Sequence, residues 1–373
     1  MRLGTGAAWL GRLAAALVAF GGLAATVHAA ALPDKIYQKG QQEPITDEVI
    51  DESIDGIKLA GSGGVSLRAE SIAKIEYADA PAAFREAETQ REQGSYDKSI
   101  RYYESALKTS RAREFWLKPT CLYYIALCQL ESGAEPAKAE ASFKELLDKW
   151  PKTRFLPDAL LGVGRAALAA RQYDTALSRF SQLGELADQR KWDEMALQAG
   201  LWKARTLVDM RRFENALSTA RSVVDSSGRF REVQIQAQVI VASVYVRLYE
   251  LPKAIDLLRS LIRSIGPDVA KEVESGGADT RMRRTESQCY NALASCFYKQ
   301  AAKETDKAKK QDGYREALLA YLWTVVLYSG FPTEYAEALD YGSDCFKELG
   351  EGSRASELKT ELGERFPDYK RSR

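Results

Sequence analysis

Apolar residues follow two different periods along this chain of 373 residues. Between 34 and 77 they form short β-branched runs that partly alternate with polar residues, as in "KIYQKG", "PITDEVID" and "GIKLAG". From about residue 80 to 370 they recur every three or four positions, which is the spacing of one face of an α-helix. We therefore expect a mainly α-helical protein that begins with a small all-β module.

The segment 34–77 contains five candidate strands. Asp-Gly at 55–56 and "GSGG" at 61–64 supply turns between them. So many strands in so short a segment predict a small barrel or a curled sheet. The pattern resembles the Sm-like small β-barrels that precede helical repeats in some bacterial envelope proteins. The alternative is a meander that packs on the first helix pair and caps it.

The helical region repeats itself. Copies such as "GSYDKSIRYYESAL" at 94–107 and "RQYDTALSRFSQL" at 171–183 place a small residue three positions after an aromatic one. The intervals between the small residues are 37–40 positions, with one of 63. A fixed period in this range indicates a repeat architecture. The small residues are Ser99, Ala139, Ala176, Ala216, Ala254, Ala317 and Ala355.

A second small residue precedes the first in each copy, by twelve positions in most of them. Each unit is therefore expected to be two helices joined by a tight turn, which cross closely at the small residues. Large residues such as Tyr103, Phe143 and Phe180 would fill the space beside the crossing. The second set is Ala87, Ala126, Gly164, Ala204, Ala242, Ala294 and Ser343.

This alternation, with Pro151 and Pro367 after a second helix, resembles the tetratricopeptide repeat over residues 80–370. The units are longer than that family's period of about 34 residues, and its Trp-x-x-Leu-Gly opening is missing from every copy. The resemblance implies an α-solenoid of about seven antiparallel helix pairs in a right-handed superhelix. It also implies a concave surface that is lined by first helices and binds peptides. "KWPKTRFLPDALLGVGRAA" at 149–167 resembles periplasmic repeat proteins of the cell envelope.

Residues 1–29 have the pattern of a signal peptide. Arg2 and Arg12 are the only charges before Asp34, and the apolar run after Arg12 ends at small residues. The run is shorter than the roughly 20 residues of a spanning helix. We expect cleavage near Ala29, a periplasmic or otherwise exported chain, and no integral membrane segment afterwards. The alternative is an uncleaved anchor. No cysteine lies near the cleavage site, so we do not expect a lipoprotein.

Cleavage would remove His28, which is the only histidine. Without imidazole, Ser-His-Asp and Cys-His catalysis and histidine-containing zinc sites are excluded. Carboxylate or lysine chemistry stays possible, but neither a phosphate-binding loop nor a dinucleotide fingerprint occurs. The net charge of +1 supplies no field that attracts nucleic acid. We expect a non-enzymatic protein without cofactor, metal or nucleic-acid partner.

The five cysteines are expected to be buried packing residues. An odd number cannot pair completely in an exported chain. Cys121 and Cys128, like Cys289 and Cys296, are seven positions apart, about 10 Å along a helix and too far for a disulfide. Cys128, Cys296 and Cys345 each lie two residues after the small residue of a first helix.

The interval of 63 residues contains two insertions. Residues 266–284 have a glycine-rich centre and are expected to form a long exposed loop. Residues 300–313 are rich in lysine and favour helix, so we expect the first helix of the sixth pair to run on for two or three turns. Each insertion is either a docking surface or a solvated extension.

The resemblance also implies a binding groove. By register, the inward positions lie one residue after, and three or six before, the small residue of each first helix. Arginines there would grip carboxylates through paired N–H donors, and amides would hydrogen-bond a peptide backbone. The alternative is that Arg165 and Arg205 pair with acids inside the solenoid. The groove residues would be Arg165, Gln198, Arg205, Gln236, Asn291 and Tyr298.

The expected function is a protein–protein interaction scaffold or adaptor in the bacterial envelope, with another protein or a peptide as its partner. The alternative is a receptor for a small ligand, such as a peptidoglycan or saccharide fragment, on the concave surface. A third possibility is an oligomerisation platform that associates with itself.

Overall fold

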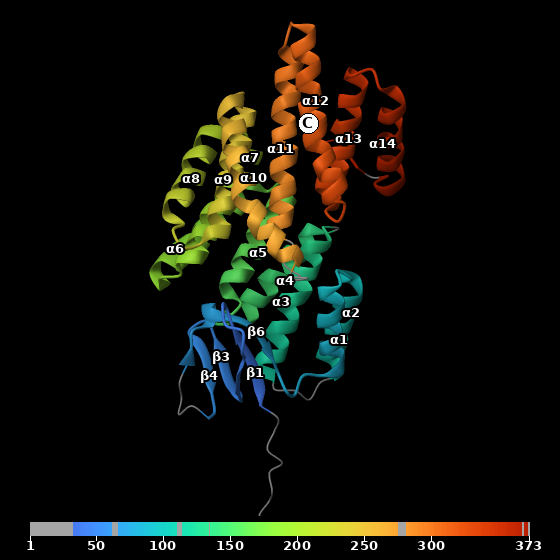
Figure 1. The fold of residues 1–373 in the computed structure, drawn as a ribbon. Coiled ribbons are helices and arrows are strands. Elements are labelled where there is room, and N and C mark those ends of the chain that lie inside the picture. Colours follow the sequence, from blue (N-terminus) through green and yellow to red (C-terminus); the bar gives the residue numbers. More distant parts are fainter. Residues whose placement is uncertain are drawn as a thin grey trace, which may run out of the picture.

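The computed structural model describes residues 33–61, 66–109, 114–133, 135–274, 281–367 and 369–371. Within these ranges six short strands precede fourteen α-helices, as Figure 1 shows. This confirms the predicted α-solenoid with a small β region before it. The expected signal peptide, with His28, lies outside the described residues.

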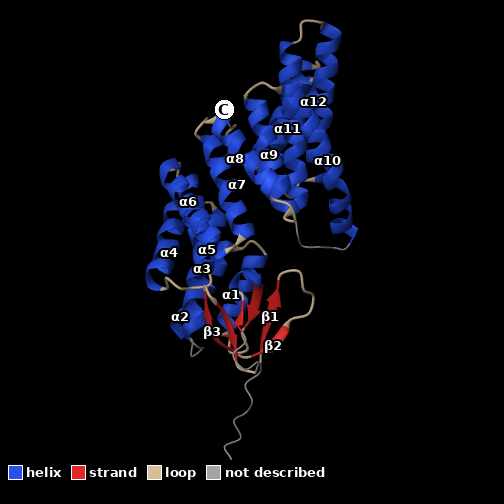
Figure 2. Ribbon diagram, turned by 90° about the vertical axis from the view of Figure 1, so that its left-hand side faces the viewer, coloured by secondary structure: helices blue, strands red, loops and turns tan. Residues whose placement is uncertain are grey.

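The β region consists of two antiparallel sheets of three strands each, at one end of the molecule (Figure 2). Their strand orders are β2-β1-β6 and β3-β4-β5. Ile36, Val49 and Ile57 are fully buried between them and the first helices. The Sm-like barrel stays a prediction. The strands are β1 Asp34–Gln38, β2 Ile45–Asp47, β3 Val49–Ser53, β4 Gly56–Leu59, β5 Ser66–Leu67 and β6 Ile72–Glu76.

The described helices follow one another as antiparallel neighbours, from α1/α2 beside the sheets to α13/α14 at the far end (Figure 1). Each second helix also packs on the first helix of the next pair. Their bounds are α1 Ala82–Glu92, α2 Tyr96–Thr109, α3 Glu114–Ser132, α4 Pro136–Lys149, α5 Leu156–Ala169, α6 Tyr173–Arg190, α7 Asp193–Asp209, α8 Phe213–Ser226, α9 Arg231–Arg247, α10 Leu251–Glu274, α11 Arg281–Lys303, α12 Lys307–Leu327, α13 Pro332–Glu348 and α14 Gly352–Arg365.

All fourteen small residues of the repeat register are buried. Two serines among them show how closely the helices cross. Ser99 Oγ donates a hydrogen bond to the carbonyl of Ala87, and Ser343 Oγ donates one to the carbonyl of Ala355, both at 2.8 Å. In each case one small position bonds to the other small position of the same pair. A larger side chain at these positions would separate the helices.

Six of the pairs turn through one residue with a positive φ angle. Gly350, between α13 and α14, has φ +82°, and Arg171, between α5 and α6, has φ +60°. An L-residue with a side chain is disfavoured there because its Cβ crowds the following carbonyl.

We expect Gly350→Ala to lower the free energy of unfolding by about 1–2 kcal/mol, because alanine must adopt a left-handed backbone. An added Cβ at Gly350 would meet no atom within 4 Å, so the cost is confined to the backbone. Gly363, inside α14, is equally open. Gly363→Ala is therefore the control and should raise stability by up to about 1 kcal/mol. Urea unfolding measures the free energy of unfolding of both variants. If the two substitutions changed it in the same direction, the positive φ of Gly350 would not explain the effect.

The insertion at 266–284 is not the exposed loop that we expected. Helix α10 runs through Pro267 to Glu274, and α11 begins at Arg281. Ile265 and Val269, four positions apart, are buried on one face of α10. The apolar period therefore outweighs the hydrogen bond that Pro267 removes. Residues 275–280 lie outside the described ranges.

The insertion at 300–313 lengthens both helices of the sixth pair instead of the first alone. Helix α11 ends at Lys303, and α12 begins at Lys307. Asp306 caps α12, since its Oδ1 accepts hydrogen bonds from the backbone N–H groups of Ala308 and Lys309 at 2.9 and 3.0 Å. Aspartate is a preferred residue at this position. The helical composition was read correctly, but the cap that divides the insertion was missed.

Candidate functional site

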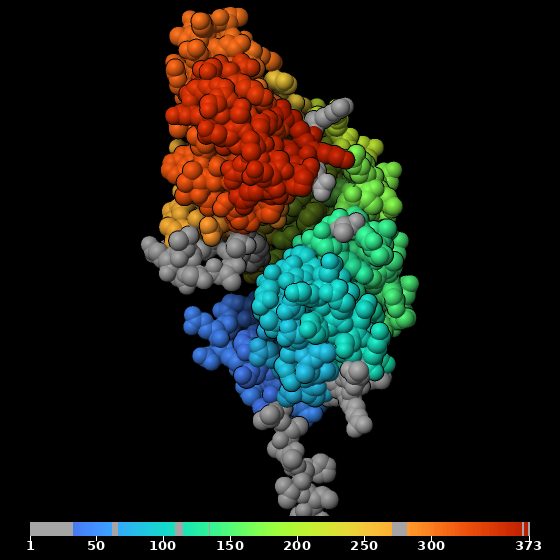
Figure 3. All heavy atoms as spheres, turned by 90° about the vertical axis from the view of Figure 1, so that its right-hand side faces the viewer, coloured from blue at the N-terminus to red at the C-terminus, as the bar shows by residue number. Residues whose placement is uncertain are grey.

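A cavity of about 900 Å³ lies between the β module and the first helices of several pairs. Helices α5, α7, α9 and α11 each contribute to its wall, and Lys39 after β1, the turn before β6 and the start of β6 contribute from the other side. Figure 3 shows a recess between the N-terminal helices, cyan to green, and the C-terminal helices, orange to red. The lining includes Lys39, Ile54, Arg68 and Glu70 from the β module and Tyr123, Leu161 and Phe230 from the helical part.

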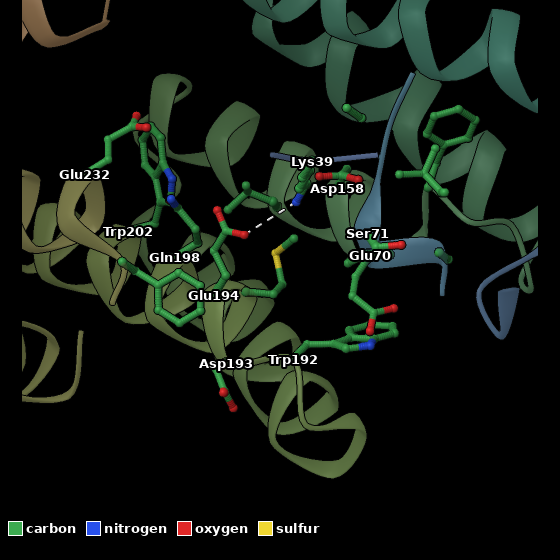
Figure 4. A pocket seen from close by; sticks show the side chains of 18 of the residues that line it. Lys39, Glu70, Ser71, Asp158, Trp192, Asp193, Glu194, Gln198, Trp202 and Glu232 are labelled. Carbon is green, nitrogen blue, oxygen red and sulfur yellow. Dashed lines mark hydrogen bonds and ion pairs between the residues drawn. The ribbon is translucent and has the colours of Figure 1, made fainter. Parts of the chain in front are cut away.

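The β module is fixed to the helices at the edge of this cavity. The backbone N–H of Ile54 donates to the carbonyl of Lys152 at 2.8 Å. Arg190 pairs with Asp55 at 2.7 Å, and Lys39 approaches Glu194 at 3.5 Å. In Figure 4, Lys39 reaches from the module toward Glu194 across the cavity. The module therefore forms part of the site wall, besides sharing a core with the first helix pair.

A row of polar side chains crosses the floor of the cavity. Asp158, Gln198, Gln236 and Gln288 come from α5, α7, α9 and α11, and all four line the cavity. Each lies six residues before the small residue of its helix. Because the repeat places equivalent positions of successive first helices side by side, one register position becomes a polar row. We call these four residues the polar row.

Trp202 lies between two arginines on the cavity wall. The guanidinium carbon of Arg205 is 4.7 Å from the centre of its ring, and that of Arg165 is 5.1 Å away. Behind it, the ring of Phe180 stacks at 6.1 Å. Cations over an aromatic face are attracted by the ring quadrupole. The tryptophan thus holds two positive groups toward the same space.

The cavity is more positive than the chain as a whole. Eight of its lining residues are Lys or Arg and five are Asp or Glu, whereas the whole chain carries +1. Burial, aided by the nearby charges of Arg165 and Arg284, lowers the pKa of Arg205 to about 10. Within the described ranges no carboxylate forms an ion pair with Arg205. The guanidinium is therefore partly desolvated, and the charge of Asp209 acts on it without forming such a pair.

Two other residues that line the cavity differ from Arg205 in the charges around them. Arg165 pairs with Glu131 at 2.7 Å, so internal pairing, our alternative, describes that arginine. Burial raises the pKa of the Asp158 carboxyl, even though Lys39 and Arg154 act in the opposite direction. The site therefore offers a guanidinium at Arg205 that no ion pair engages in the described chain, and a carboxyl at Asp158 whose ionisation is disfavoured by burial.

Four of the six predicted groove residues meet in this cavity: Arg165, Gln198, Arg205 and Gln236. The structure does not bring Asn291 or Tyr298 into it. Asn291 is 3% exposed, and its Nδ2 donates to the carbonyl of Glu334 at 2.8 Å. This face of α11 packs against α13, so Asn291 holds two helices together.

Tyr298 packs edge-on against Tyr314, with ring centres 5.3 Å apart. It is half-buried among aromatic side chains of the last pairs, and burial raises its pKa to about 12. The register calculation also missed Trp202 and every residue of the β module. Trp202 lies two positions before its small residue and was detectable from the register. The module's residues needed the docked structure.

All five cysteines are buried and none is disulfide-bonded, as predicted for packing residues. Burial raises the pKa of Cys289 and Cys345 to about 12 and that of Cys296 to about 11. Thiols are poor nucleophiles and metal ligands in this state. Among the described residues no group of three or more His, Cys, Asp or Glu side chains is placed to hold a metal ion.

We expect the native protein to react slowly with dithiobis-nitrobenzoate at pH 8, since few of its thiols ionise and none is accessible. In guanidinium chloride all five should react at once. Ser222→Cys, at an exposed position of α8, is the control and should add one fast thiol. A fast thiol in the unmodified native protein would contradict the packing role.

Comparison with known proteins supports a tetratricopeptide-repeat protein. Residues 120–153, which span most of α3 and all of α4, match the family described as tetratricopeptide repeat. No curated protein matches the sequence. None of the described helices has the length and hydropathy required to span a membrane.

Similar solved structures share the fold at low sequence identity. A tetratricopeptide repeat protein from Parabacteroides merdae is 11% identical, with a TM-score of 0.50 over 76% of this chain and 92% of its own. The apo form of RapI is 10% identical, with a TM-score of 0.52 over 77% and 98%. A STAND protein with a tetratricopeptide repeat sensor from Pyrococcus horikoshii is 12% identical (TM-score 0.51), over 77% of this chain and 42% of its own.

Proposed function

We propose that this chain is a protein-interaction scaffold that binds an extended segment of a partner protein in the cavity between the β module and helices α5–α11. The observation that carries the proposal is the combination of the polar row with Arg205, which forms no ion pair with a carboxylate among the described residues. The helical-repeat fold supports it, since such folds present continuous inner surfaces for binding.

The polar row suits a peptide backbone. Each glutamine amide can donate to a carbonyl and accept from an N–H. Packed helices lie about 8–10 Å apart, and an extended chain advances about 3.3 Å per residue. Gln198, Gln236 and Gln288 would therefore contact about every third residue of a bound segment, and would leave the residues between free to vary.

The charges predict which side chains the segment carries. A carboxylate from the partner would pair with Arg205 through two parallel N–H donors and would offset the desolvation that lowers its pKa. Asp158, at the end nearer the β module, would favour a basic group. We therefore propose a segment with an acidic residue near α7 and a basic one near α5.

We place this interaction in the bacterial envelope on the strength of the expected signal peptide at residues 1–29. In this setting the protein would act as an adaptor without catalysis and without a nucleic-acid partner. The β module would close one end of the cavity and so limit how far a bound segment extends.

A small-ligand receptor is the second candidate, because the cavity volume of about 900 Å³ falls within the range of small-molecule sites. Trp202 would then stack on a saccharide ring. Thermal shifts with muropeptides and with peptides selected from a random library separate the two candidates. The scaffold requires stabilisation by the peptides and none by muropeptides, and the reverse result would favour the receptor.

Alanine at both Arg165 and Arg205 tests the site itself. We expect library-selected acidic peptides to lose at least about tenfold in affinity, since each lost charge-assisted hydrogen bond is worth about 1.5–3 kcal/mol. Arg259→Ala, an exposed arginine of α10 outside the cavity, is the control and should leave affinity unchanged. Equal affinities in both variants would refute the groove.

A further inference from the structure

Helix α12 exposes a stripe of large apolar side chains. Leu319, Trp323, Val326 and Leu327 are 62%, 50%, 72% and 46% exposed. Their spacing of four, seven and eight positions places them on one helix face. The other large apolar residues exposed in the described chain are scattered: Ile50 lies in β3, Tyr102 in α2, and Tyr249 in the turn between α9 and α10. We call the four residues the α12 stripe.

This face of α12 does not pack in the core of the solenoid. The opposite side of α12, with Ala317, Tyr321 and Thr324, is buried against the neighbouring helices. Thr324 Oγ1 lies 3.5 Å from the carbonyl of Ser287 in α11. The core of the sixth pair is therefore complete without the stripe.

Comparison with the other repeats shows that the stripe is specific to α12. It occupies the positions two, six, nine and ten residues after the small residue Ala317. In α10 and α14 all four equivalent positions carry Ser or charged residues. In α8 they carry Ser218, Ser222, Asp225 and Ser226. The other second helices thus carry mainly polar residues at these positions, and only α12 presents a fully apolar set among the second helices.

The stripe is also electrically neutral. From Ala317 to Thr333 the sequence contains no charged residue. A charged partner surface would gain nothing here and would lose its hydration. An apolar surface would be buried favourably, at about 25 cal/mol per Å².

We propose that a second copy of this chain covers the stripe, with the two α12 helices packed across a two-fold axis. Leu319, Trp323 and Val326 follow a four–three spacing, which is the seam along which two helices interlock. A contact across a two-fold axis needs one patch that complements itself. An apolar stripe without charges can pack against its own copy, because no like charges are brought together. The chain's net charge of +1 adds almost no repulsion between copies.

The α11–α12 hairpin is lengthened at residues 300–313, and its tip projects beyond the neighbouring pairs (Figure 1). The stripe begins six residues beyond this insertion, in the half of α12 nearer α13. The stripe exposes on the order of 400 Å² of apolar surface, which is the size of the largest patch on a typical monomer and is often functional. It would supply about half of one side of a standard interface. A standard interface buries about 800 Å² per partner. Tyr290, which stacks on Trp323 at 6.1 Å, would extend the patch.

Sedimentation equilibrium of the whole chain tests the proposal. We expect twice the mass of a single chain, with Trp323→Glu reduced to one chain at the same concentration. Tyr102→Glu, at an exposed aromatic residue on α2, is the control and should stay dimeric. A monomeric wild-type protein would overturn the proposal, and so would a Trp323→Glu dimer. A monomer that binds neutral lipid vesicles through Trp323 would replace the second copy by a membrane surface.

A cysteine at the proposed axis supplies a second test. Trp323→Cys should form a disulfide between two chains on mild oxidation, because the axis brings the two residues 323 together. Ser222→Cys occupies the same register position on α8 and should stay unlinked. Equal crosslinking of both variants, or of neither, would overturn the proposed arrangement. The outcome is independent of the cavity, which these variants do not touch.

Discussion

Replacing Arg154 by alanine is expected to lower the free energy of unfolding by about 3–5 kcal/mol, the cost of breaking a buried ion pair. Arg154 Nε lies 2.9 Å from Glu52 Oε2, and the two side chains are 10% and 3% exposed. Tyr77 donates a hydrogen bond to the same oxygen at 2.6 Å. Burial already raises the pKa of Glu52 despite the arginine, and without Arg154 the buried carboxylate would keep only the hydrogen bond from Tyr77.

The loss of stability in Arg154→Ala should arise mainly because the charge of Glu52 is left buried without its partner. Arg154→Met combined with Glu52→Met removes both charges and should cost far less than Arg154→Ala alone. Arg229→Ala breaks the pair with Asp193, whose side chains are 75% and 63% exposed, and should cost less than about 1 kcal/mol. Guanidinium unfolding measures all three. If Arg154→Ala resembled Arg229→Ala, this ion pair would not lock the β module to the helices.

Phe180→Ala should cost a similar amount, about 3–5 kcal/mol, because it empties a packed site in the core. Phe180 is fully buried where α6 crosses α5. A Cβ added at Gly164 would lie only 2.4 Å from its ring, so the ring fits directly against the glycine. Thermal or guanidinium unfolding measures the loss.

A double-mutant cycle tests the contact between Phe180 and Gly164. Gly164→Ala alone should cost about 1–3 kcal/mol, since the new methyl group overpacks the crossing. In the Phe180→Ala background the same substitution should cost little, because the ring is gone. Ala166→Gly on the same helix is the control and should lower stability by similar amounts in both backgrounds. Additive costs for Gly164 and Phe180 would contradict a packed crossing at these residues.

The helix pairs were predictable because the crossings restrict residue size. A small residue such as Ala176 or Gly164 is required wherever two helices touch, and the requirement recurs with the repeat. The loop expected at 266–284 was wrong, because the prediction rested on the glycine-rich centre of this segment. Ile265 and Val269 continue the buried face of α10 through Pro267, and tertiary packing decides such cases.

Only those site residues that occupy repeated positions of the first helices were predictable from the sequence. Register arithmetic placed Gln198 and Gln236 on the inner surface, because equivalent positions of stacked helices share an environment. It failed for Asn291, whose helix face is covered by α13. The cavity also depends on contacts between distant segments, such as Glu52 with Arg154, 102 positions apart in the sequence. No local pattern reports such a contact.

In the proposed complex a segment of the partner protein lies in the cavity beside Gln198. A photo-crosslinking amino acid at Gln198, in cells that produce the whole chain, tests it most directly. Gln182, exposed on α6 and outside the cavity, is the control position. We expect a discrete crosslinked protein from position 198 and none from position 182. The crosslink from position 198 should disappear when Arg165 and Arg205 are both replaced by alanine. Crosslinks from 182 alone, or crosslinks from 198 that survive both alanines, would contradict the proposed complex.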